Sequence, residues 1–299
     1  MISLINKYRP QTLDEVVGQQ KAVKIFRRNM ERNEDENFLL FGPPGTGKTT
    51  IAMAYAKESG YEFREFNASD DRRIEFIRST IIPIARAKSL TGTKKVIFLD
   101  EADQLTKDSQ MALRRIMESP SYRNNIFILA ANEPEKLKDA LISRCVPIRF
   151  KPLATEDLLK VMNLVIKGEH VDISEEDKLK LAEMARGDAR KMITLITEYA
   201  TDGTIDDVIF DMKKFLSLIK AGNFDEALYF IKDWAFKDVS REVMYYLRER
   251  KNYKMLVKFG DRVIFNYQPD DIIGKMTLIA DMIENYYDVV KTNKNEDFV

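Results

Sequence analysis

The feature that most constrains the fold is a glycine-rich segment that directly follows a short apolar run. Residues 38–41 are apolar, and residues 42–50 read Gly-Pro-Pro-Gly-Thr-Gly-Lys-Thr-Thr. This G-x-x-x-x-G-K-[ST] spacing lets consecutive backbone N–H groups close around an anion. The helix-forming residues that follow would direct a helix N-terminus at the same anion. The segment predicts a strand, a phosphate-binding loop and a helix; the alternative is a glycine turn that binds no nucleotide.

Within this interpretation the loop supplies both phosphate and metal contacts. Lys48 would reach the terminal phosphates of a nucleotide, and the hydroxyl of Thr49 would hold Mg²⁺. The residues expected to contact the nucleotide here are Gly42, Pro43, Pro44, Gly45, Thr46, Gly47, Lys48, Thr49 and Thr50. A nucleotide with Mg²⁺ is therefore the expected ligand.

An acidic pair follows the next strong strand signal. Residues 96–99 read Val-Ile-Phe-Leu, a run typical of a strand that is buried on both faces of a parallel sheet. Asp100 and Glu101 then fall where an open α/β sheet places its ligand-binding groups. Asp100 would hold Mg²⁺ through water, and Glu101 would orient or deprotonate the water that attacks the γ-phosphate. The alternative is a pair of surface acids that cap the following helix.

Three further polar residues lie at the ends of expected elements. Asn132 ends an expected strand at residues 126–131, and its amide could position the attacking water, although turns also favour asparagine. Arg144 follows a short helix and could complete its own site or a neighbour's. Arg190 begins a helix, against the helix dipole, which a bound phosphate or ordinary solvent exposure would explain.

The charge of the whole chain gives no argument for a nucleic-acid partner. The 299 residues contain 48 Lys and Arg and 48 Asp and Glu, so any nucleic-acid surface must be a local patch. One stretch, from Arg64 to Lys95, holds eight basic residues against four acidic ones. Such a surplus is usually only a solvated face.

Cysteine and histidine are each present once, as Cys145 and His170. A single cysteine excludes an internal disulfide and a cysteine-based zinc site, which fits a reducing compartment. Cys145 is expected to be a small buried hydrophobe rather than a nucleophile, since the histidine lies in a polar turn. With neither a leader nor an apolar run of about 20 residues, we expect a cytoplasmic protein with no membrane partner.

The domain organisation follows from a change of pattern at Pro152. Before it, expected strands alternate with helices, and after it only helical patterns remain. We therefore expect an α/β domain with a parallel sheet at residues 1–152, followed by helical parts at 153–210 and 211–299. A chain of this length is sufficient for three cores.

Several short motifs occur in one consistent order over residues 1 to about 200. They are Lys7-Tyr8-Arg9-Pro10, Gly42 to Thr49, Asn67-Ala68-Ser69-Asp70-Asp71-Arg72, Asp100-Glu101-Ala102-Asp103, Gln110 to Arg115 and Ser143-Arg144-Cys145. Together they resemble the small ATPase subunit of sliding-clamp loaders, replication factor C, in its archaeal or T4-like bacteriophage form. The resemblance implies an AAA+ P-loop nucleoside triphosphatase domain at 1–152, a helical lid at 153–210 and a helical collar at 211–299 that joins subunits in a ring.

The same resemblance implies roles for individual residues. The arm that packs around the adenine would consist of Tyr8, Arg9, Pro10 and Val17. Asn132 matches the first sensor, and Arg190 matches the lid sensor that contacts the phosphates. Arg144 matches the arginine finger, which acts on ATP held by the adjacent subunit. Contacts with the DNA backbone would come from Arg72, Arg78 and Lys88.

The implied function is ATP-driven loading of a ring-shaped clamp onto primer-template DNA, with ATP and Mg²⁺ as cofactors. The implied partners are the sliding clamp, the large subunit of the loader, the DNA backbone and further copies of this chain in a pentameric ring. The work would take place in the cytoplasm, or in the host cytoplasm for a phage protein. The alternatives are another DNA-dependent AAA+ motor, such as a branch-migration helicase, and a nucleotide-binding scaffold without catalysis. Intact Asp100, Glu101 and Arg144 argue against the scaffold.

Overall fold

The computed structural model describes residues 3–89 and 92–202, together with isolated positions between 215 and 229. By its internal contacts the chain divides into two units, Met1–Asp207 and Val208–Val299. The expected collar at 211–299 lies outside the described residues apart from the isolated positions, and the expected domain boundaries stay predictions. Among the described residues, no helix combines the length and the apolar character that crossing a membrane requires.

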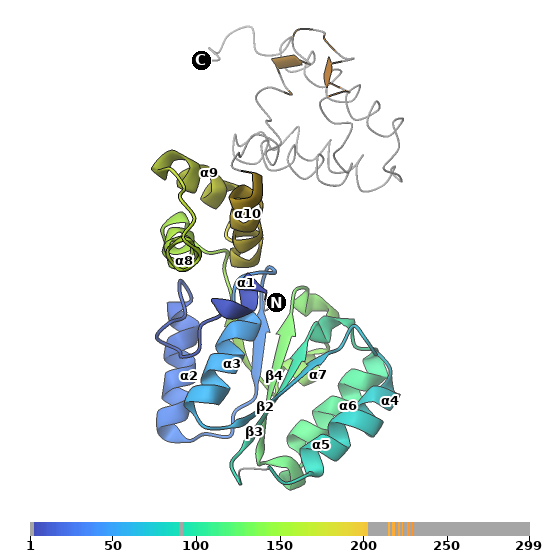
Figure 1. Ribbon diagram of the computed structural model, residues 1–299. Coiled ribbons are helices and arrows are strands. Elements are labelled where there is room, and N and C mark those ends of the chain that lie inside the picture. Colours follow the sequence, from blue (N-terminus) through green and yellow to red (C-terminus); the bar gives the residue numbers. More distant parts are fainter. Residues whose placement is uncertain are drawn as a thin grey trace, which may run out of the picture. The chain divides into compact units, whose positions relative to one another are not determined.

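A five-stranded parallel sheet forms the centre of the first unit (Figure 1). Its spatial order is β2-β3-β4-β1-β5. The strands are β1 (Phe38–Phe41), β2 (Glu62–Asn67), β3 (Lys95–Asp100), β4 (Asn125–Ala131) and β5 (Val146–Arg149). This all-parallel sheet confirms the α/β class predicted from the buried-strand pattern.

Helices cover both faces of the sheet (Figure 1). Helices α2 and α3 lie on one face, and α4 to α7 lie on the other. The α-helices of the described residues are α1 (Leu4–Lys7), α2 (Gln20–Arg32), α3 (Lys48–Glu58), α4 (Ile74–Phe76), α5 (Ile82–Arg86), α6 (Lys107–Glu118), α7 (Asp139–Ile142), α8 (Thr155–Glu169), α9 (Glu175–Ala185) and α10 (Ala189–Asp202). Shorter turns are the π-helical η1 (Ile77–Ile81) and the 3₁₀ turns η2 (Ala102–Gln104), η3 (Pro120–Tyr122) and η4 (Pro134–Lys136).

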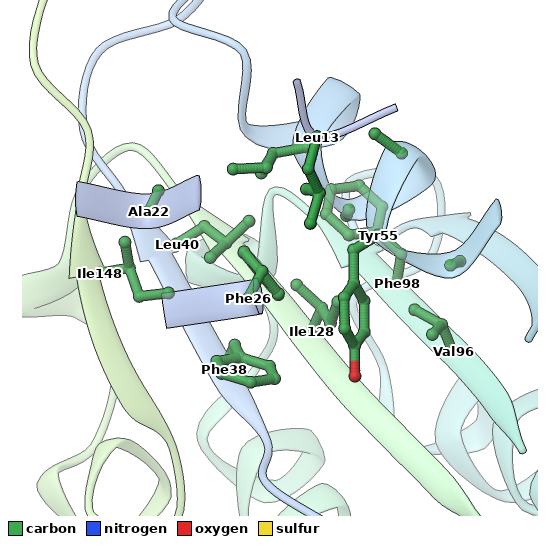
Figure 2. Packing of buried hydrophobic residues seen from close by; sticks show 14 of the residues in the cluster. Leu13, Ala22, Phe26, Phe38, Leu40, Tyr55, Val96, Phe98, Ile128 and Ile148 are labelled. Carbon is green, nitrogen blue, oxygen red and sulfur yellow. The ribbon is translucent and has the colours of Figure 1, made fainter. Parts of the chain in front are cut away.

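Strand β4 shows why the central strands read as continuous apolar runs. Each of its residues is buried. Ile128 belongs to the core under α2 and α3, whereas its neighbour Phe127 belongs to the core on the opposite face. Figure 2 shows the first core, where the ring centroids of Phe26 and Phe38 are 4.6 Å apart. A strand covered on both faces carries apolar side chains at successive positions, here Ile126 to Ala131, and not only at alternate ones.

The parallel register brings the carboxyl ends of β1, β3 and β4 to one edge of the sheet. Phe41, which ends β1, pairs with Ala131, which ends β4, and β3 runs parallel beside β4. The residues that follow these strands are Gly42, Glu101 and Asn132. Groups from three distant parts of the sequence therefore meet where open α/β sheets bind their ligands.

Helices α8, α9 and α10 make a separate all-helical group, the lid. The helix α9 begins with a side-chain cap, since Ser174 Oγ accepts a hydrogen bond of 3.1 Å from the backbone N–H of Asp177. Asp188 plays the same part before α10, where its Oδ1 accepts a 2.9 Å bond from the N–H of Lys191. Such caps satisfy N–H groups that the helix itself leaves unpaired.

Candidate nucleotide site

Lys48 lies at the start of α3, and three oxygen atoms surround its ammonium. It donates hydrogen bonds to the carbonyls of Gly42 (2.7 Å) and Pro43 (2.9 Å) and to Asn132 Oδ1 (2.8 Å). Its side chain is mostly buried, and burial lowers the pKa of Lys48, with nearby carboxylates opposing the shift. The site thus holds an ammonium ordered by its neighbours, and an anion that binds beside it would replace one of these three acceptors.

Thr49 and Asp100 lie side by side at the ends of α3 and β3. The Thr49 hydroxyl donates to Asp100 Oδ2 at 3.2 Å. A hydroxyl and a carboxylate are hard oxygen donors that suit Mg²⁺, which retains water and takes phosphate oxygens as further ligands. Within residues 3–89 and 92–202, no cluster of three or more His, Cys, Asp or Glu side chains offers a metal an all-protein site. The donor set therefore fits a Mg²⁺ ion that arrives with a nucleotide.

Glu101 has a left-handed backbone conformation, with φ 51° and ψ 38°. Its N–H donates to Asp100 Oδ1 at 2.9 Å, and its carbonyl accepts from Gln104 N–H at 2.8 Å. For a residue with a Cβ this conformation costs on the order of 1 kcal/mol. Backbone strain of this kind concentrates at functional positions, which agrees with the place of Glu101 beside the cavity.

These groups line a cavity of about 150 Å³, here called the phosphate cavity. It brings together most of the nucleotide residues expected from the sequence: Tyr8, Arg9, Pro44, Gly45, Gly47, Lys48, Thr49, Thr50, Asp100, Glu101, Asn132 and Arg190. Sequence reasoning missed three apolar members of its wall, Ile5, Ala189 and Ile193. Gly42 and Pro43 take part through the carbonyls that hold Lys48.

A second cavity of about 110 Å³, the arm–lid cavity, shares Tyr8, Gly47, Thr50 and Ala189 with the first. It contains the remaining expected residues, Pro10, Val17 and Thr46. The residues that sequence reasoning missed are Glu15, Val16, Leu153, Lys160, Val161, Leu164 and Ala189. Apolar residues spaced along a helix are usually core residues, so the sequence carries no signal that separates the lid wall from ordinary packing.

The lid contacts the phosphate loop directly. Ala189, the first residue of α10, donates its N–H to the carbonyl of Gly45 at 3.0 Å. Gly45 has φ +68°, and a Cβ built there would lie 1.7 Å from Asp188 Oδ1. The N-terminus of α10 therefore packs on the loop, and Arg190 lines the phosphate cavity as expected.

Two buried polar residues support the acidic strand end and Asn132. Asp103 is only 5% exposed, and its Oδ1 accepts a 3.3 Å bond from the N–H of Asn132. Gln110, also buried, donates to the carbonyl of Leu105 at 3.0 Å and accepts from Lys138 N–H at 2.8 Å. Both join the segment after β3 to the segment after β4. Both belong to motifs quoted from the sequence, Asp100-Glu101-Ala102-Asp103 and Gln110 to Arg115, but no role was predicted for either side chain.

Arg144 does not line the phosphate cavity of its own chain. Its Nε donates to Glu118 Oε1 at 2.6 Å, and Arg114 Nε donates to the same oxygen at 2.8 Å. These hydrogen bonds, with Arg144 first, lower the pKa of Glu118. Arg144 therefore does not complete the cavity of its own chain as the structure stands, and its action on a neighbour's site stays a prediction.

The DNA candidates Arg72, Arg78 and Lys88 are exposed and lie outside both cavities. The carbonyl of Arg72 accepts bonds from Ser109 Oγ at 2.7 Å and from Thr106 N–H at 3.0 Å. These bonds fix the backbone of Arg72 at the N-terminus of α6 and leave its side chain in solvent. The DNA contacts of Arg72, Arg78 and Lys88 stay predictions.

The parallel sheet, the phosphate loop and the acidic strand end define a P-loop ATPase of the AAA type, and residues 38–153 match the family "ATPase family associated with various cellular activities (AAA)". The replication factor C small subunit of Staphylothermus marinus is 37% identical over 237 residues, which cover 74% of this chain and 72% of that protein. That of Archaeoglobus fulgidus is 38% identical over 240 residues, 75% of each chain. The chain belongs to the replication factor C small subunit family, which confirms the resemblance found in its motifs.

Solved structures with the same fold include the RuvB Holliday junction branch migration motor of Thermotoga maritima. It matches with a TM-score of 0.59 and 21% identity, covering 82% of this chain and 80% of that chain. At this identity the likeness concerns the fold alone. The AAA architecture is therefore shared with a motor, and the distinction between loader and motor depends on the sequence.

Proposed function

We propose that the chain is the small ATPase subunit of a sliding-clamp loader, in which ATP binding and hydrolysis drive loading of the clamp onto primer-template DNA. The observation that supports the proposal most is that one cavity is lined by Lys48, Thr49, Asp100, Glu101 and Asn132. The membership of the chain in this family gives that cavity its interpretation. This set matches the parts that phosphoryl transfer requires: phosphate binding, metal binding and orientation of the attacking water.

Each residue of the cavity has a distinct task in hydrolysis. Lys48 and the loop N–H groups bind the β- and γ-phosphates, while Arg190 contacts the phosphates from the lid. Mg²⁺ held by Thr49 and Asp100 would neutralise charge on the phosphate oxygens. Glu101 orients the attacking water and accepts its proton, and Asn132 helps to position that water.

Arg144 completes the site of the adjacent subunit in a pentameric ring. This is supported by its position outside its own phosphate cavity, in an exposed cluster with Glu118. A guanidinium supplied in trans stabilises charge in the transition state. A monomer would then bind ATP but hydrolyse it slowly, so that hydrolysis depends on assembly with the large subunit and the clamp.

DNA would contact the ring through Arg72, Arg78 and Lys88. All three would contact phosphates, which makes binding sensitive to salt and indifferent to sequence. DNA contact aligns Glu101 with the neighbouring Arg144, hydrolysis follows, and the loader releases the clamp. Hydrolysis therefore acts as the release step.

The deciding experiment is steady-state ATP hydrolysis by the assembled loader with clamp, with primer-template DNA, and with both. Arg144→Ala is mixed with wild type, and Arg123→Ala, an exposed arginine outside the site, is the control. We expect strong stimulation only by clamp and DNA together, lost with Arg144→Ala although ATP still binds. Stimulation by DNA alone would indicate a motor, and ATP binding without hydrolysis would indicate a scaffold.

A further inference from the structure

The N-terminal arm and the lid meet at a carboxylate that lies beyond the phosphate cavity. Glu169, the last residue of α8, accepts a hydrogen bond from the Tyr8 hydroxyl at 2.6 Å and another from Lys7 Nζ at 2.7 Å. Both donors use the same oxygen, Oε1. The Glu169 side chain is 25% exposed. A charge-assisted hydrogen bond with restricted solvent access is stronger than one between neutral groups.

Gly168 provides a second and independent fit between the same two segments. A Cβ built on Gly168 would lie 2.0 Å from the Tyr8 hydroxyl oxygen and 2.8 Å from Cζ. Any larger residue would therefore displace the phenol ring. We call Lys7, Tyr8, Gly168 and Glu169 the arm–lid latch.

Tyr8 is also a wall of both cavities. The arm–lid cavity is lined by Val17 of the arm and by Val161 and Leu164 of α8. An apolar cleft that continues from a phosphate loop suits a flat aromatic base. Because the arm and α8 form separate walls, the width of this cleft depends on what joins them.

We propose that Glu169 is a positioning residue of the nucleotide site: by holding the Tyr8 hydroxyl it keeps the arm against α8 and so closes the cleft that takes the base. The inference rests on the proposed function in that ATP is the ligand. It goes beyond that function by assigning the base-dependent part of ATP affinity to one contact, between Tyr8 and Glu169. These two residues are about 160 positions apart in the sequence. The phosphate-dependent part is assigned to Lys48 and the phosphate loop.

The test compares ATP with inorganic tripolyphosphate, which carries phosphates but no base, as ligands of the full-length chain. Tyr8→Phe removes the donor, Glu169→Ala removes the acceptor, and the double variant completes a cycle. We expect ATP to bind about fivefold more weakly to each single variant, with little further loss in the double variant. Tripolyphosphate affinity is expected to change less than about twofold, and Glu169→Gln, which keeps an acceptor oxygen, to recover part of the loss.

A different substitution and a matched control separate the latch from general damage. Gly168→Ala should weaken ATP binding in the same base-dependent way, because it displaces the Tyr8 ring. Glu176→Ala breaks an exposed ion pair with Lys180 on α9 (2.8 Å) and should leave both affinities unchanged. In steady-state assays of the assembled loader, the latch variants should raise KM for ATP and preserve kcat.

Two results would overturn the inference. One is wild-type ATP affinity in Tyr8→Phe and Glu169→Ala, and the other is equal weakening of ATP and tripolyphosphate. Failure of the proposed function gives a different pattern, because the assembled wild-type protein would then hydrolyse ATP with DNA alone or not at all, whatever the latch variants do to ATP affinity.

Discussion

At the scale of single residues, two glycines with the same backbone show what tertiary contact adds. Gly45 has φ +68° and Gly60 has φ +69°. A Cβ on Gly60 meets no heavy atom within 4 Å, whereas a Cβ on Gly45 would collide with Asp188. A residue with a Cβ would therefore be strained at either position, and only at Gly45 would it also collide with the lid.

We expect Gly60→Ala to lower the free energy of unfolding by about 1 kcal/mol, the cost of a left-handed alanine. Gly45→Ala should cost about 1–2 kcal/mol more, because it also displaces the cap of α10. Urea unfolding measures both, and ATP binding should weaken only in Gly45→Ala. Equal losses in the free energy of unfolding would show that the close approach of Gly45 to Asp188 does not affect stability.

Cys145 is held in an apolar setting that raises the pKa of its thiol to about 12. Because the thiolate is the reactive form, the folded protein should react with iodoacetamide at pH 8 at least about tenfold more slowly than the chain unfolded in guanidinium. The rate for the folded protein should keep rising by about tenfold per pH unit above pH 8, whereas the rate for the unfolded chain should level off near pH 9. Fast modification of the native chain at pH 8 would contradict the burial of this thiol.

At the scale of elements, the short helix α5 depends on polar side chains from the strands beneath it. Lys95 of β3 is 3% exposed, and its ammonium donates to the carbonyls of Ile84 and Ala87. Asn125 of β4 donates to the carbonyl of Ala85 at 3.0 Å. A five-residue helix makes few hydrogen bonds of its own, so these contacts bind its C-terminal end to the sheet.

Lys95→Met removes the donor while keeping much of the side-chain volume. We expect a loss of about 1–3 kcal/mol in the free energy of unfolding, because two carbonyl groups lose their partner. The control is the adjacent Lys94→Met, which breaks contacts with Asp35 and Asn33 nearer the surface and should cost less than about 1 kcal/mol. Chemical denaturation measures the difference; similar losses would contradict the capping role.

At the scale of the whole molecule, the sheet domain and the lid both contribute to the phosphate loop region. Gln19 donates to the carbonyls of Thr46 (3.2 Å) and Lys151 (2.8 Å), and Ala189 donates to Gly45 from the lid. A ligand in the phosphate cavity would therefore contact groups that several elements position. Its binding energy should appear as stability of the folded chain.

ATP with Mg²⁺ at one hundred times its Kd should stabilise the folded state by about 2.7 kcal/mol. The thermal midpoint should rise accordingly, and chelation of Mg²⁺ with EDTA should reduce the rise. Lys48→Ala should abolish it, since the phosphates lose their principal cation. An unchanged rise in Lys48→Ala would mean that the nucleotide binds elsewhere.

The sequence by itself determined the phosphate loop, the buried central strands and the acidic strand end. Each is a local pattern: the spacing from Gly42 to Thr49 and the apolar run before Asp100 need no knowledge of distant residues. From these patterns the parallel sheet and most of the phosphate cavity could be predicted.

Only the tertiary structure decided which distant residues meet. The contacts of Tyr8 with Glu169, of Gly45 with Ala189 and of Arg144 with Glu118 join segments between 26 and 161 positions apart. The lid wall of the arm–lid cavity has the same apolar helical spacing as ordinary core. Its role follows from how α8 and α10 pack against the arm and the loop, and this packing is set by contacts that no local pattern encodes.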